Sequence, residues 1–551
     1  MKKYLIVLGA LAATLILPFM MRPSEERREV DPNGTLTIIS PHVESIRSEF
    51  TRAFQRFMKD KHNRNVEIQW LTPGGTSEID KYVETEYRAA FENYWGETQS
   101  EKWTPEAGNA VALSKPVGDD QPRLKAARDV FLNSNLGIKI DLFFGGGTYD
   151  FDKQKKKGYL VATTPDGAHG TAAIKKAHPD WFTDAIIPQT FSGQPFYDPD
   201  LCWVGNCLSS FGIVYNKDVL ERIGISDPPR QWTDLTSPSY SGSIALADPG
   251  KSASAAMAFE MIIQQQMQQA LARLKKASLT PNPTVAAPVK TEAEAISEGW
   301  MLGLQIIQKI AANARYFTDS APRPPMDVSR GEAAAGMAID FYGKTFVEKL
   351  QQPNGECRVV YLTPEGGSSV SADAIGMFRG APNPELATVF MEFVLSLEGQ
   401  RLWGHKSGTP GGPTRVALRR LPIRKDYYVP AERALASDPE EMPYEKINFN
   451  YNAKYTGPAF NALRLIVRAM CLDTQEEMKT AWHELVRHGF PPRATENFSD
   501  LRLLSYEKVM TDIAKVCNGS DKLLQARLAR DLGGMFRNQY LNATAMALRG
   551  E

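Results

Sequence analysis

The chain has 551 residues, which exceeds one ordinary hydrophobic core and predicts two or three domains. Hydrophobic residues make up 42% of it and charged residues 23%, a composition typical of soluble globular proteins. Lys plus Arg number 64, as do Asp plus Glu, so the net charge is zero. This balance gives no basic excess to favour a nucleic acid partner and no acidic excess typical of a solvating tail.

The N-terminal segment, residues 1–30, has the pattern of an export signal. Lys2 and Lys3 precede an apolar run over residues 4–21, and a charged stretch follows. The run has no clear small-residue cleavage site and is nearly long enough to span a bilayer. Signal cleavage and retention as an inner-membrane anchor therefore both stay open. No later segment is long and apolar enough to cross a membrane, so the rest of the chain is expected to be periplasmic or otherwise extracytoplasmic.

Short apolar strands alternate with helices along most of the chain. Residues 36–39 predict a strand, residues 46–57 an amphipathic helix and residues 66–70 a second strand, which together make one parallel unit. Residues 92–122 are rich in Gly, Pro and polar residues and predict a loop insertion. Further strands are predicted at residues 141–144, 211–215, 243–247, 337–341 and 358–362, and helices from about residue 252 and over residues 383–403.

The pattern changes after about residue 430. Residues 458–472, 474–488 and 503–516 predict helices, and no strand pattern occurs there. Residues 431–551 are therefore expected to form a helical C-terminal extension. Within it, His483 and His488 are five residues apart, so they do not share one helix face as the two histidines of a helical zinc motif must.

The chain has five cysteines, which cannot all pair. Cys202 and Cys207 are close in sequence, and a local disulfide between them suits an oxidising compartment. The alternative is that both are small packing residues. The cysteine spacings do not match a zinc site.

Several distinctive loops follow predicted strands, where open parallel sheets bind ligands. Gly146, Gly147 and Thr148 end one strand and allow close approach of the backbone to a ligand. The segment from Asp248 to Ser254 joins a strand to a helix, whose free N–H groups and dipole attract anions. In that segment the candidate ligand-binding residues are Asp248, Ser252 and Ser254, and simple helix capping is the alternative.

Three other sequence features concern the ligand or a partner. Position 245 is Ala where a nucleotide-binding loop ending in Gly250-Lys251-Ser252 needs Gly, so such a loop is rejected. His42 follows the first strand and can ligate a metal or hydrogen-bond an anion. The basic residues within 415–425 form a solvated surface or face a membrane partner.

A family resemblance rests on several stretches in a fixed order over about residues 36–415. They are LTIISPH, DLFFGGGT, FGIVYNKDVLERIGISDPPRQWTDLTSPSYSGSIALADPGKSAS, MAIDFYG, LTPEGG and ELATVFMEFVLSLEGQRLW. In this order the chain resembles the periplasmic solute-binding proteins of ABC transporters, in the iron-binding-like branch.

The resemblance implies an α/β fold of the two-lobed class II periplasmic-binding-protein type, with a ligand held between the lobes. It also implies a membrane permease as partner and no catalysis. We expect lobe one over residues 35–155 and 365–430, lobe two over residues 156–364, and the extension outside the resemblance.

The segment from Asp340 to Gly343 departs from the iron-binding relatives. Those proteins carry two adjacent tyrosines, whereas this chain has Phe341 followed by Tyr342. The resemblance implies His42 and Tyr342 as metal ligands if the solute is ferric iron, with Asp340 as a further oxygen donor. Phe341 cannot ligate, so an organic or phosphorylated anion remains the other expected ligand.

Two other functions remain open from the sequence. One is a membrane-anchored sensory or scaffold binding protein whose extension contacts a partner. The other is a secreted enzyme on the same fold, which would need an acid and base such as Asp340 and His42 to converge.

Overall fold

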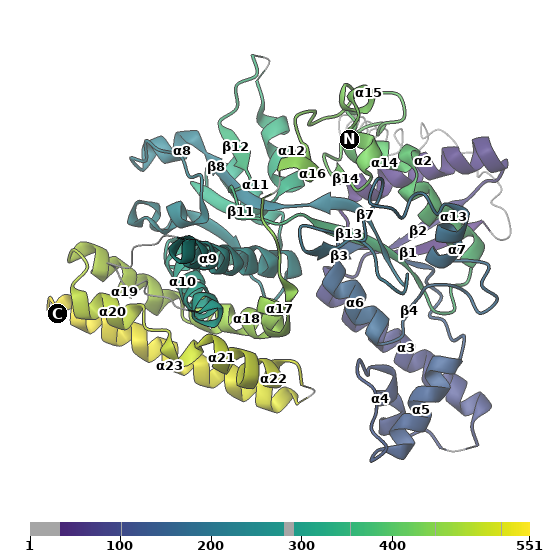
Figure 1. The fold of residues 1–551 in the computed structure, drawn as a ribbon, viewed down its shortest axis with the longest axis horizontal. Helices are drawn as coiled ribbons and strands as arrows, with labels where there is room; N and C mark the ends of the chain where they lie inside the picture. The colour runs from purple at the N-terminus through teal and green to yellow at the C-terminus, as the bar shows by residue number, and fades with distance from the viewer. Residues whose placement is uncertain (1–33, 101, 280–290, 353, 447, 520) are drawn as a thin grey trace, which may run out of the picture.

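The computed structural model describes residues 34–551 apart from residues 101, 280–290, 353, 447 and 520. It has two α/β lobes side by side, with the C-terminal helices packed along one of them (Figure 1). The predicted export segment lies outside the described residues. No helix in the described part of the chain is long and apolar enough to cross a membrane.

The sheet of lobe one combines parallel and antiparallel strands. Its strands are β1 (Thr35–Ile39), β2 (Glu67–Leu71), β3 (Leu142–Gly147), β4 (Leu160–Val161), β7 (Val204–Ser209), β13 (Ser371–Phe378) and β14 (Leu421–Pro422), while β5 (Thr190–Phe191) and β6 (Gln194–Pro195) pair separately. The order is β14-β7-β13-β3-β1-β2, with β4 beside β13. β1 runs parallel to β2 and β3, so their carboxyl ends lie at one edge, which faces lobe two.

Helices cover both faces of this sheet because side chains alternate along each strand. In β3, for example, Leu142 and Phe144 enter one core and Phe143 enters the other. The first core is covered by α2 (Glu44–His62), α7 (Thr171–Ala177), α13 (Pro384–Leu395) and α14 (Leu397–Gly404). The second is covered by α3 (Thr76–Thr98), α4 (Pro105–Val111), α5 (Pro122–Asn133) and α6 (Thr148–Lys156).

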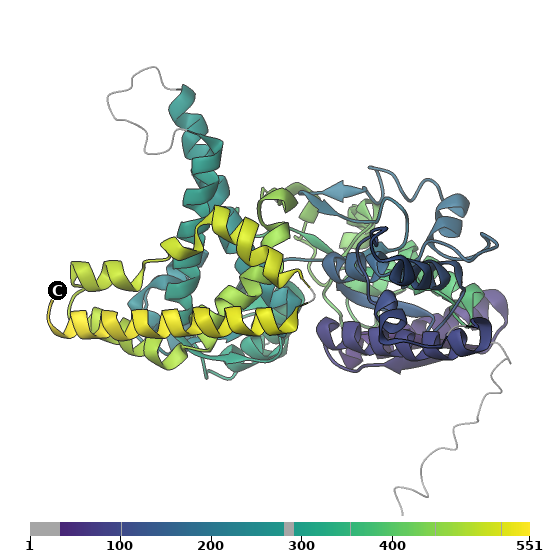
Figure 2. The ribbon, with the colours of Figure 1, turned by 90° about the horizontal axis from the view of Figure 1, so that it is seen from below.

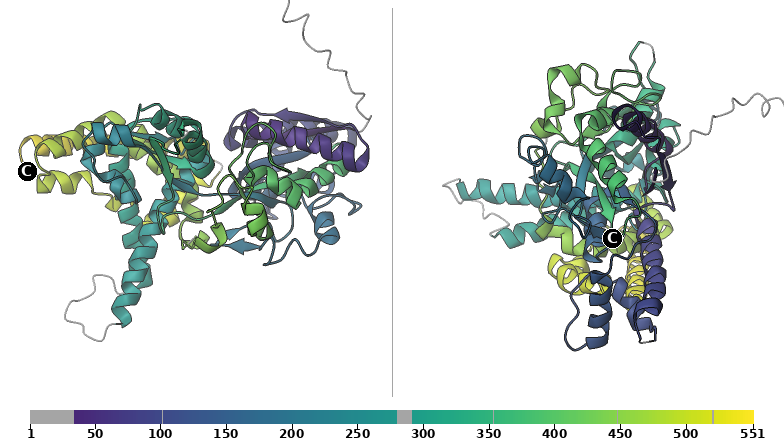
Figure 3. Two further views of the ribbon diagram at one scale, coloured as in Figure 1. Left: turned by 90° about the horizontal axis from the view of Figure 1, so that it is seen from above. Right: turned by 90° about the vertical axis from the view of Figure 1, so that its right-hand side faces the viewer.

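Lobe two has its own sheet, of order β10-β9-β11-β8-β12. Its elements are β8 (Phe211–Asn216), α8 (Lys217–Arg222), β9 (Ile244–Ala247), α9 (Ala253–Leu279), α10 (Glu292–Ala312), β10 (Ala314–Thr318), α11 (Arg323–Ser329), β11 (Ala335–Ile339), α12 (Asp340–Leu350) and β12 (Val359–Leu362). β9 and β11 are parallel neighbours, so α9 and α12 both begin at the edge that faces lobe one. The helix pair α9 and α10 projects from the body of the molecule (Figures 2 and 3).

The C-terminal region is helical, as expected. Two short helices, α15 (Pro430–Arg433) and α16 (Pro443–Lys446), lie against lobe one. The remaining helices are α17 (Ala453–Thr456), α18 (Phe460–Val467), α19 (Gln475–Arg487), α20 (Pro492–Phe498), α21 (Tyr506–Lys508), α22 (Ala514–Cys517) and α23 (Lys522–Leu548). They share one continuous core with the sheet and helices of lobe two.

The chain passes between the lobes at three places. It crosses after β7, again between β12 and β13, and a third time between Tyr444 and Phe449. Tyr444 packs on lobe one, whereas Phe449 is buried in the core of lobe two. The third crossing leads into the C-terminal helices.

Two predicted boundaries are wrong. Residues 156–209 belong to lobe one rather than lobe two, because β4 and β7 pair with β13. Residues 431–446 likewise pack on lobe one, so the part of the extension that joins lobe two begins near Phe449.

Two predicted elements also differ from the structure. The predicted loop over residues 92–122 contains the last turns of α3 and all of α4, because Trp95 and Trp103 pack together with ring centroids 6.3 Å apart, and Thr104 caps α4. The predicted helix over residues 383–403 is divided at Ser396, whose hydroxyl accepts from the Gly399 N–H and caps α14.

The predicted disulfide is not formed, and Cys202 and Cys207 are free thiols. Cys207 enters the core on one face of the lobe-one sheet, while Cys202 packs against the core on the other face. Burial raises the pKa of Cys202 to about 12 and that of Cys207 well above its usual value. Both cysteines are therefore packing thiols.

Candidate functional site

The candidate site lies where the two sheets face each other. The loops after β1 and β3 come from lobe one, and those after β9 and β11 come from lobe two. The sequence-predicted residues therefore lie at the boundary between the lobes, in two groups. One group surrounds His42 and Asp340, and the other lies at the starts of α6 and α9.

His42 is buried against the backbone of lobe one. A Cβ at Gly145 would lie 2.3 Å from the Nε2 of His42, and Gly145 has a φ of +93°, so only glycine fits there. Burial and the nearby charge of Arg420 lower the pKa of His42 to about 3, which makes its imidazole neutral. Its Nε2 is buried and has no hydrogen-bond partner among the residues that the structure describes.

Arg420 is the centre of the first group, and no sequence prediction singled it out. Its guanidinium pairs with the Asp373 carboxylate at 2.7 Å and donates to the Ser209 hydroxyl. The same guanidinium lies 4.3 Å from the centroid of the Phe341 ring, so it joins lobe one to α12 of lobe two. Its Nε is buried and has no acceptor within the described part of the chain.

The basic run at residues 415–425, predicted to be a solvated surface or to face a membrane partner, was the sequence signal for Arg420. The solvated alternative is wrong for two members of the run, since Arg420 is 2% and Arg424 is 5% exposed. Burial lowers the pKa of Arg420, whereas the Asp373 carboxylate raises it, and the net effect is a raised pKa.

Asp340 and Tyr342 begin α12 beside Arg420. The Asp340 carboxylate accepts from the Ser210 N–H at 3.2 Å and from its hydroxyl at 3.3 Å. Burial raises the pKa of Asp340 to about 6, against the opposing charges of Lys344 and Arg420. Burial also raises the pKa of Tyr342 to about 12, so its phenol stays protonated at neutral pH.

Nothing in this group forms an acid–base pair. Asp340 is bonded to Ser210, and His42 Nε2 has no partner among the described residues. In the described part of the chain, no three His, Cys, Asp or Glu side chains gather closely enough to hold a metal ion.

The second group begins with the glycine loop after β3. A Cβ at Gly146 would lie 2.7 Å from the Thr76 methyl group, whereas one at Gly147 would meet nothing within 4 Å. Open space therefore lies beside Gly147, where α6 begins at the half-buried Thr148. The next acidic residue, Asp150, is buried, and its Oδ2 has no hydrogen-bond partner in the described structure. Burial raises the pKa of Asp150 to about 6.

The loop after β9 is organised by its own side chains. The Asp248 carboxylate accepts from the Gly250 N–H at 2.7 Å, and the Ser252 hydroxyl accepts from the Ala255 N–H at 3.2 Å. Ser252 therefore caps α9, and its own hydroxyl proton remains to be donated. Ser254 lines a small hollow beside β11. The loop comes close to lobe one, because a Cβ at Gly75 would lie 3.9 Å from the Lys251 carbonyl oxygen.

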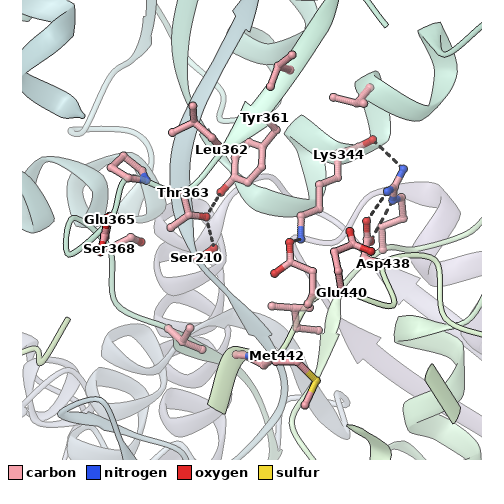
Figure 4. Close-up of a pocket in the computed structure, with 18 of the residues that line it drawn as sticks. Ser210, Lys344, Tyr361, Leu362, Thr363, Glu365, Ser368, Asp438, Glu440 and Met442 are labelled. Atoms are coloured by element: carbon pink, nitrogen blue, oxygen red, sulfur yellow. Dashed lines mark hydrogen bonds and ion pairs between the residues drawn. The ribbon is translucent and has the colours of Figure 1, made fainter. Parts of the chain in front are cut away.

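A larger cavity of about 610 Å³ lies beside β12 and α12, lined on its other side by residues 438–443 (Figure 4). None of the candidate ligand-binding residues predicted from the sequence lines it, although Arg419 of the basic run does. Its buried Lys344 pairs with Glu441 at 2.7 Å, and its Arg419 pairs with Asp438. A chain of hydroxyl contacts links its Tyr361 through Thr363 to Ser210, the partner of Asp340 (Figure 4).

Comparison with protein families gives one match. The model of the bacterial extracellular solute-binding proteins matches residues 140–436. That range covers lobe one from β3 onward and all strands of lobe two, ends just after α15, and leaves out β1, β2 and the helices α2 to α5.

Two curated proteins resemble part of the chain. An uncharacterised protein of Haemophilus influenzae is 25% identical over 195 residues, which cover 35% of this chain and 45% of that protein. The phosphoglycerate transport regulatory protein PgtC of Salmonella typhimurium is 22% identical over 199 residues, which cover 36% of this chain and 40% of PgtC. The chain thus spans less than half the length of these relatives.

Two solved structures match the chain at low identity. The periplasmic binding protein AfuA of Actinobacillus pleuropneumoniae, with fructose-6-phosphate bound, is 18% identical with a TM-score of 0.42. The match covers 67% of this chain and 81% of AfuA. Iron-bound HitA of Pseudomonas aeruginosa is 15% identical with a TM-score of 0.44, covering 79% of this chain and 99% of HitA.

Proposed function

Because the chain belongs to the bacterial extracellular solute-binding protein family, we propose that it captures an organic or phosphorylated anion between its lobes and delivers it to an ABC transporter permease. Binding without catalysis is the activity that this arrangement of residues supports best. The protein acts outside the cytoplasm, either free or held by its N-terminal segment.

This proposal rests on two buried polar atoms at the lobe boundary whose hydrogen-bonding capacity the described residues leave unused. In the part of the chain that the structure describes, Arg420 Nε is a buried donor without an acceptor, and His42 Nε2 is buried without a partner. A buried polar group left unpaired costs about 1–3 kcal/mol, so a ligand that pairs with it recovers that free energy. The fixed positive charge of Arg420 favours an anionic ligand.

The start of α9 supports the same ligand class from the opposite lobe. The first N–H groups of a helix lack intrahelical acceptors, and the helix dipole favours negative charge there. The Ser252 hydroxyl retains a proton to donate, and the open space beside Gly147 faces the same boundary. PgtC, a relative of this chain, carries phosphoglycerate in its name, and phosphoglycerate is a phosphorylated organic anion.

Ferric iron is the less favoured cargo on the chemistry of these donors. Phe341 offers no oxygen and packs under the Arg420 guanidinium. Tyr342 has a pKa raised to about 12, whereas a phenolate ligand must lose its proton. The adjacent cation Arg420 opposes a second positive charge at His42 and Tyr342.

Ligand-dependent thermal stabilisation of the purified protein tests this proposal. The panel contains phosphoglycerate, phosphorylated sugars, phosphonates, polyamines, and ferric iron with and without carbonate or phosphate. A ligand present at about 100 times its dissociation constant adds about 2.7 kcal/mol to the stability of the folded state. We expect an organic or phosphorylated anion to raise the melting temperature.

Two substitutions and one control sharpen the assay. Ser252→Ala should weaken the response to the anion, whereas Ser239→Ala, at an exposed serine in a turn of lobe two, should leave it unchanged. A response to iron that Tyr342→Phe abolishes would instead make this a metal-binding protein. Turnover of a ligand by the purified protein would contradict the proposal of binding without catalysis.

A further inference from the structure

The C-terminal helices form one body with lobe two. Leu463 of α18 and Phe536 of α23 enter the same core as Ile244 of β9 and Trp300 of α10. Polar contacts reinforce this packing, since the Trp300 indole donates to the Leu504 carbonyl at 2.8 Å. The Gln264 amide of α9 likewise donates to the Thr456 hydroxyl at 2.6 Å. Any rotation of lobe two must therefore carry α18 with it.

From this body, α18 reaches across the boundary to lobe one. The Tyr149 hydroxyl of α6 donates to Asn461 Oδ1 at 3.1 Å. The Tyr149 ring also lies 4.8 Å from the ring of Phe460, centroid to centroid. Both contacts join lobe one to the extension, which lies outside the region that the family model matches.

Arg464 on the same helix contacts both lobes at once. Its Nε donates to the Pro249 carbonyl and its Nη2 to the Gly250 carbonyl, each at 2.8 Å. The same Nη2 donates to the Ser77 hydroxyl of α3, in lobe one, at 3.3 Å. One guanidinium therefore holds the loop before α9 in place and ties it to the opposite lobe.

Charge favours the same contact. Asp150 of lobe one is buried near Arg464, whose positive charge opposes the rise in the pKa of that carboxyl caused by burial. On the other side of the lobe boundary, Arg420 packs on the ring of Phe341. The lobes are thus joined on two sides, and the side formed by α18 is specific to the extension.

We propose that α18 is a latch, in which Arg464 and Asn461 hold lobe two against lobe one when no ligand is present. The latch positions the loop of residues 248–252 at the lobe boundary and makes closure partly independent of ligand. This role goes beyond the proposed capture of a solute, because it concerns the empty protein.

Small-angle X-ray scattering of the full-length protein without ligand tests the latch. Arg464→Ala and Tyr149→Phe should each shift the radius of gyration and the maximum dimension to larger values. Tyr149→Phe keeps the ring against Phe460 and removes only the donor to Asn461, so it preserves packing. Arg464→Lys keeps the charge without the planar fork and should fall between Arg464→Ala and the wild type.

A matched control lies one turn further along. Arg468 is exposed, and its ion pair among the described residues is with Asp473 of the extension, so Arg468→Ala should scatter like the wild type. Thermal unfolding of every variant identifies any that fails to fold. Unchanged dimensions in both Arg464→Ala and Tyr149→Phe would overturn the latch, as would an equal expansion in Arg468→Ala. No ligand is used, so the outcome does not depend on which solute the protein carries.

Discussion

At the scale of single residues, Glu260 on α9 is a buried carboxyl group between lobe two and the extension. It accepts from the Tyr451 hydroxyl at 3.0 Å and from the Thr456 hydroxyl, while its second oxygen has no partner among the described residues. Burial raises its pKa from 4.5 to about 7, although both hydroxyl groups oppose the shift. The ionised form is therefore disfavoured in the folded protein.

Glu260→Gln should change how stability depends on pH. Since the folded pKa is raised, the wild type is free of this penalty below about pH 4.5 and loses stability as the pH rises to about 7. The free energy of unfolding of the variant, relative to the wild type, should thus increase by about 3 kcal/mol over that range. Chemical denaturation at pH 4.5, 6 and 8 measures the difference, and a constant offset between the two proteins would contradict it.

Local sequence patterns predicted which loops lie at the interface between the lobes, but not the charged group at its centre. His42, the glycine loop and the Asp248–Ser254 loop lie there because strand ends can be recognised from local sequence. Arg420 could not be found this way. Its burial depends on Asp373 and on the ring of Phe341, which come from distant parts of the chain. Its immediate sequence neighbours instead suggest a solvated basic surface.

At the scale of elements, α9 and α10 pack closely because α10 has glycines at the contact. A Cβ at Gly303 would lie 2.6 Å from the Ile263 Cα atom, and one at Gly299 would lie 2.3 Å from the Met267 Cα atom. The two helices can approach this closely only without side chains at these positions. The pair forms the projecting arm seen in Figures 2 and 3.

Gly303→Ala should therefore destabilise the protein despite the better helix propensity of alanine. Overpacking costs about 1–3 kcal/mol, which outweighs a propensity gain of up to about 1 kcal/mol. Gly534→Ala in α23 is the matched control, because a Cβ there meets nothing within 4 Å. That substitution should stabilise by up to about 1 kcal/mol. Equal effects of the two changes in a denaturation experiment would refute this account of the contact.

The alternation of strands and helices was predictable from local apolar periodicity, and β1, α2, β2, β8 and β9 lie close to their predicted positions. The predictions failed where tertiary contacts, rather than local sequence, determine the secondary structure or the strand pairing. The segment over residues 92–122 has loop-like composition, yet a cluster of aromatic rings around Trp103 stabilises its helices. The residue at which lobe two was predicted to begin was wrong, because β7 pairs with β13, which comes much later in the chain.

At the scale of the whole molecule, the extension is part of the folding unit of lobe two. Phe536 in α23 is fully buried in that core, so Phe536→Ala should destabilise the protein by about 3–5 kcal/mol. Leu541 on the same helix is 53% exposed, and Leu541→Ala should stay within about 0.5 kcal/mol of the wild type. Urea unfolding followed by tryptophan fluorescence compares them. A Phe536→Ala protein as stable as the wild type would show that the extension is only loosely attached.

The third crossing of the chain between the lobes has a consequence for the order of folding during synthesis. All strands of lobe one have been made once β14 is complete, and its associated helices end with α16. Lobe two lacks part of its core until α23 has been made, because Phe536 and Tyr540 fill it. At that stage lobe one is complete, whereas the apolar core of lobe two stays exposed until about a hundred further residues have been made. A chaperone that shields apolar surfaces would act at that stage.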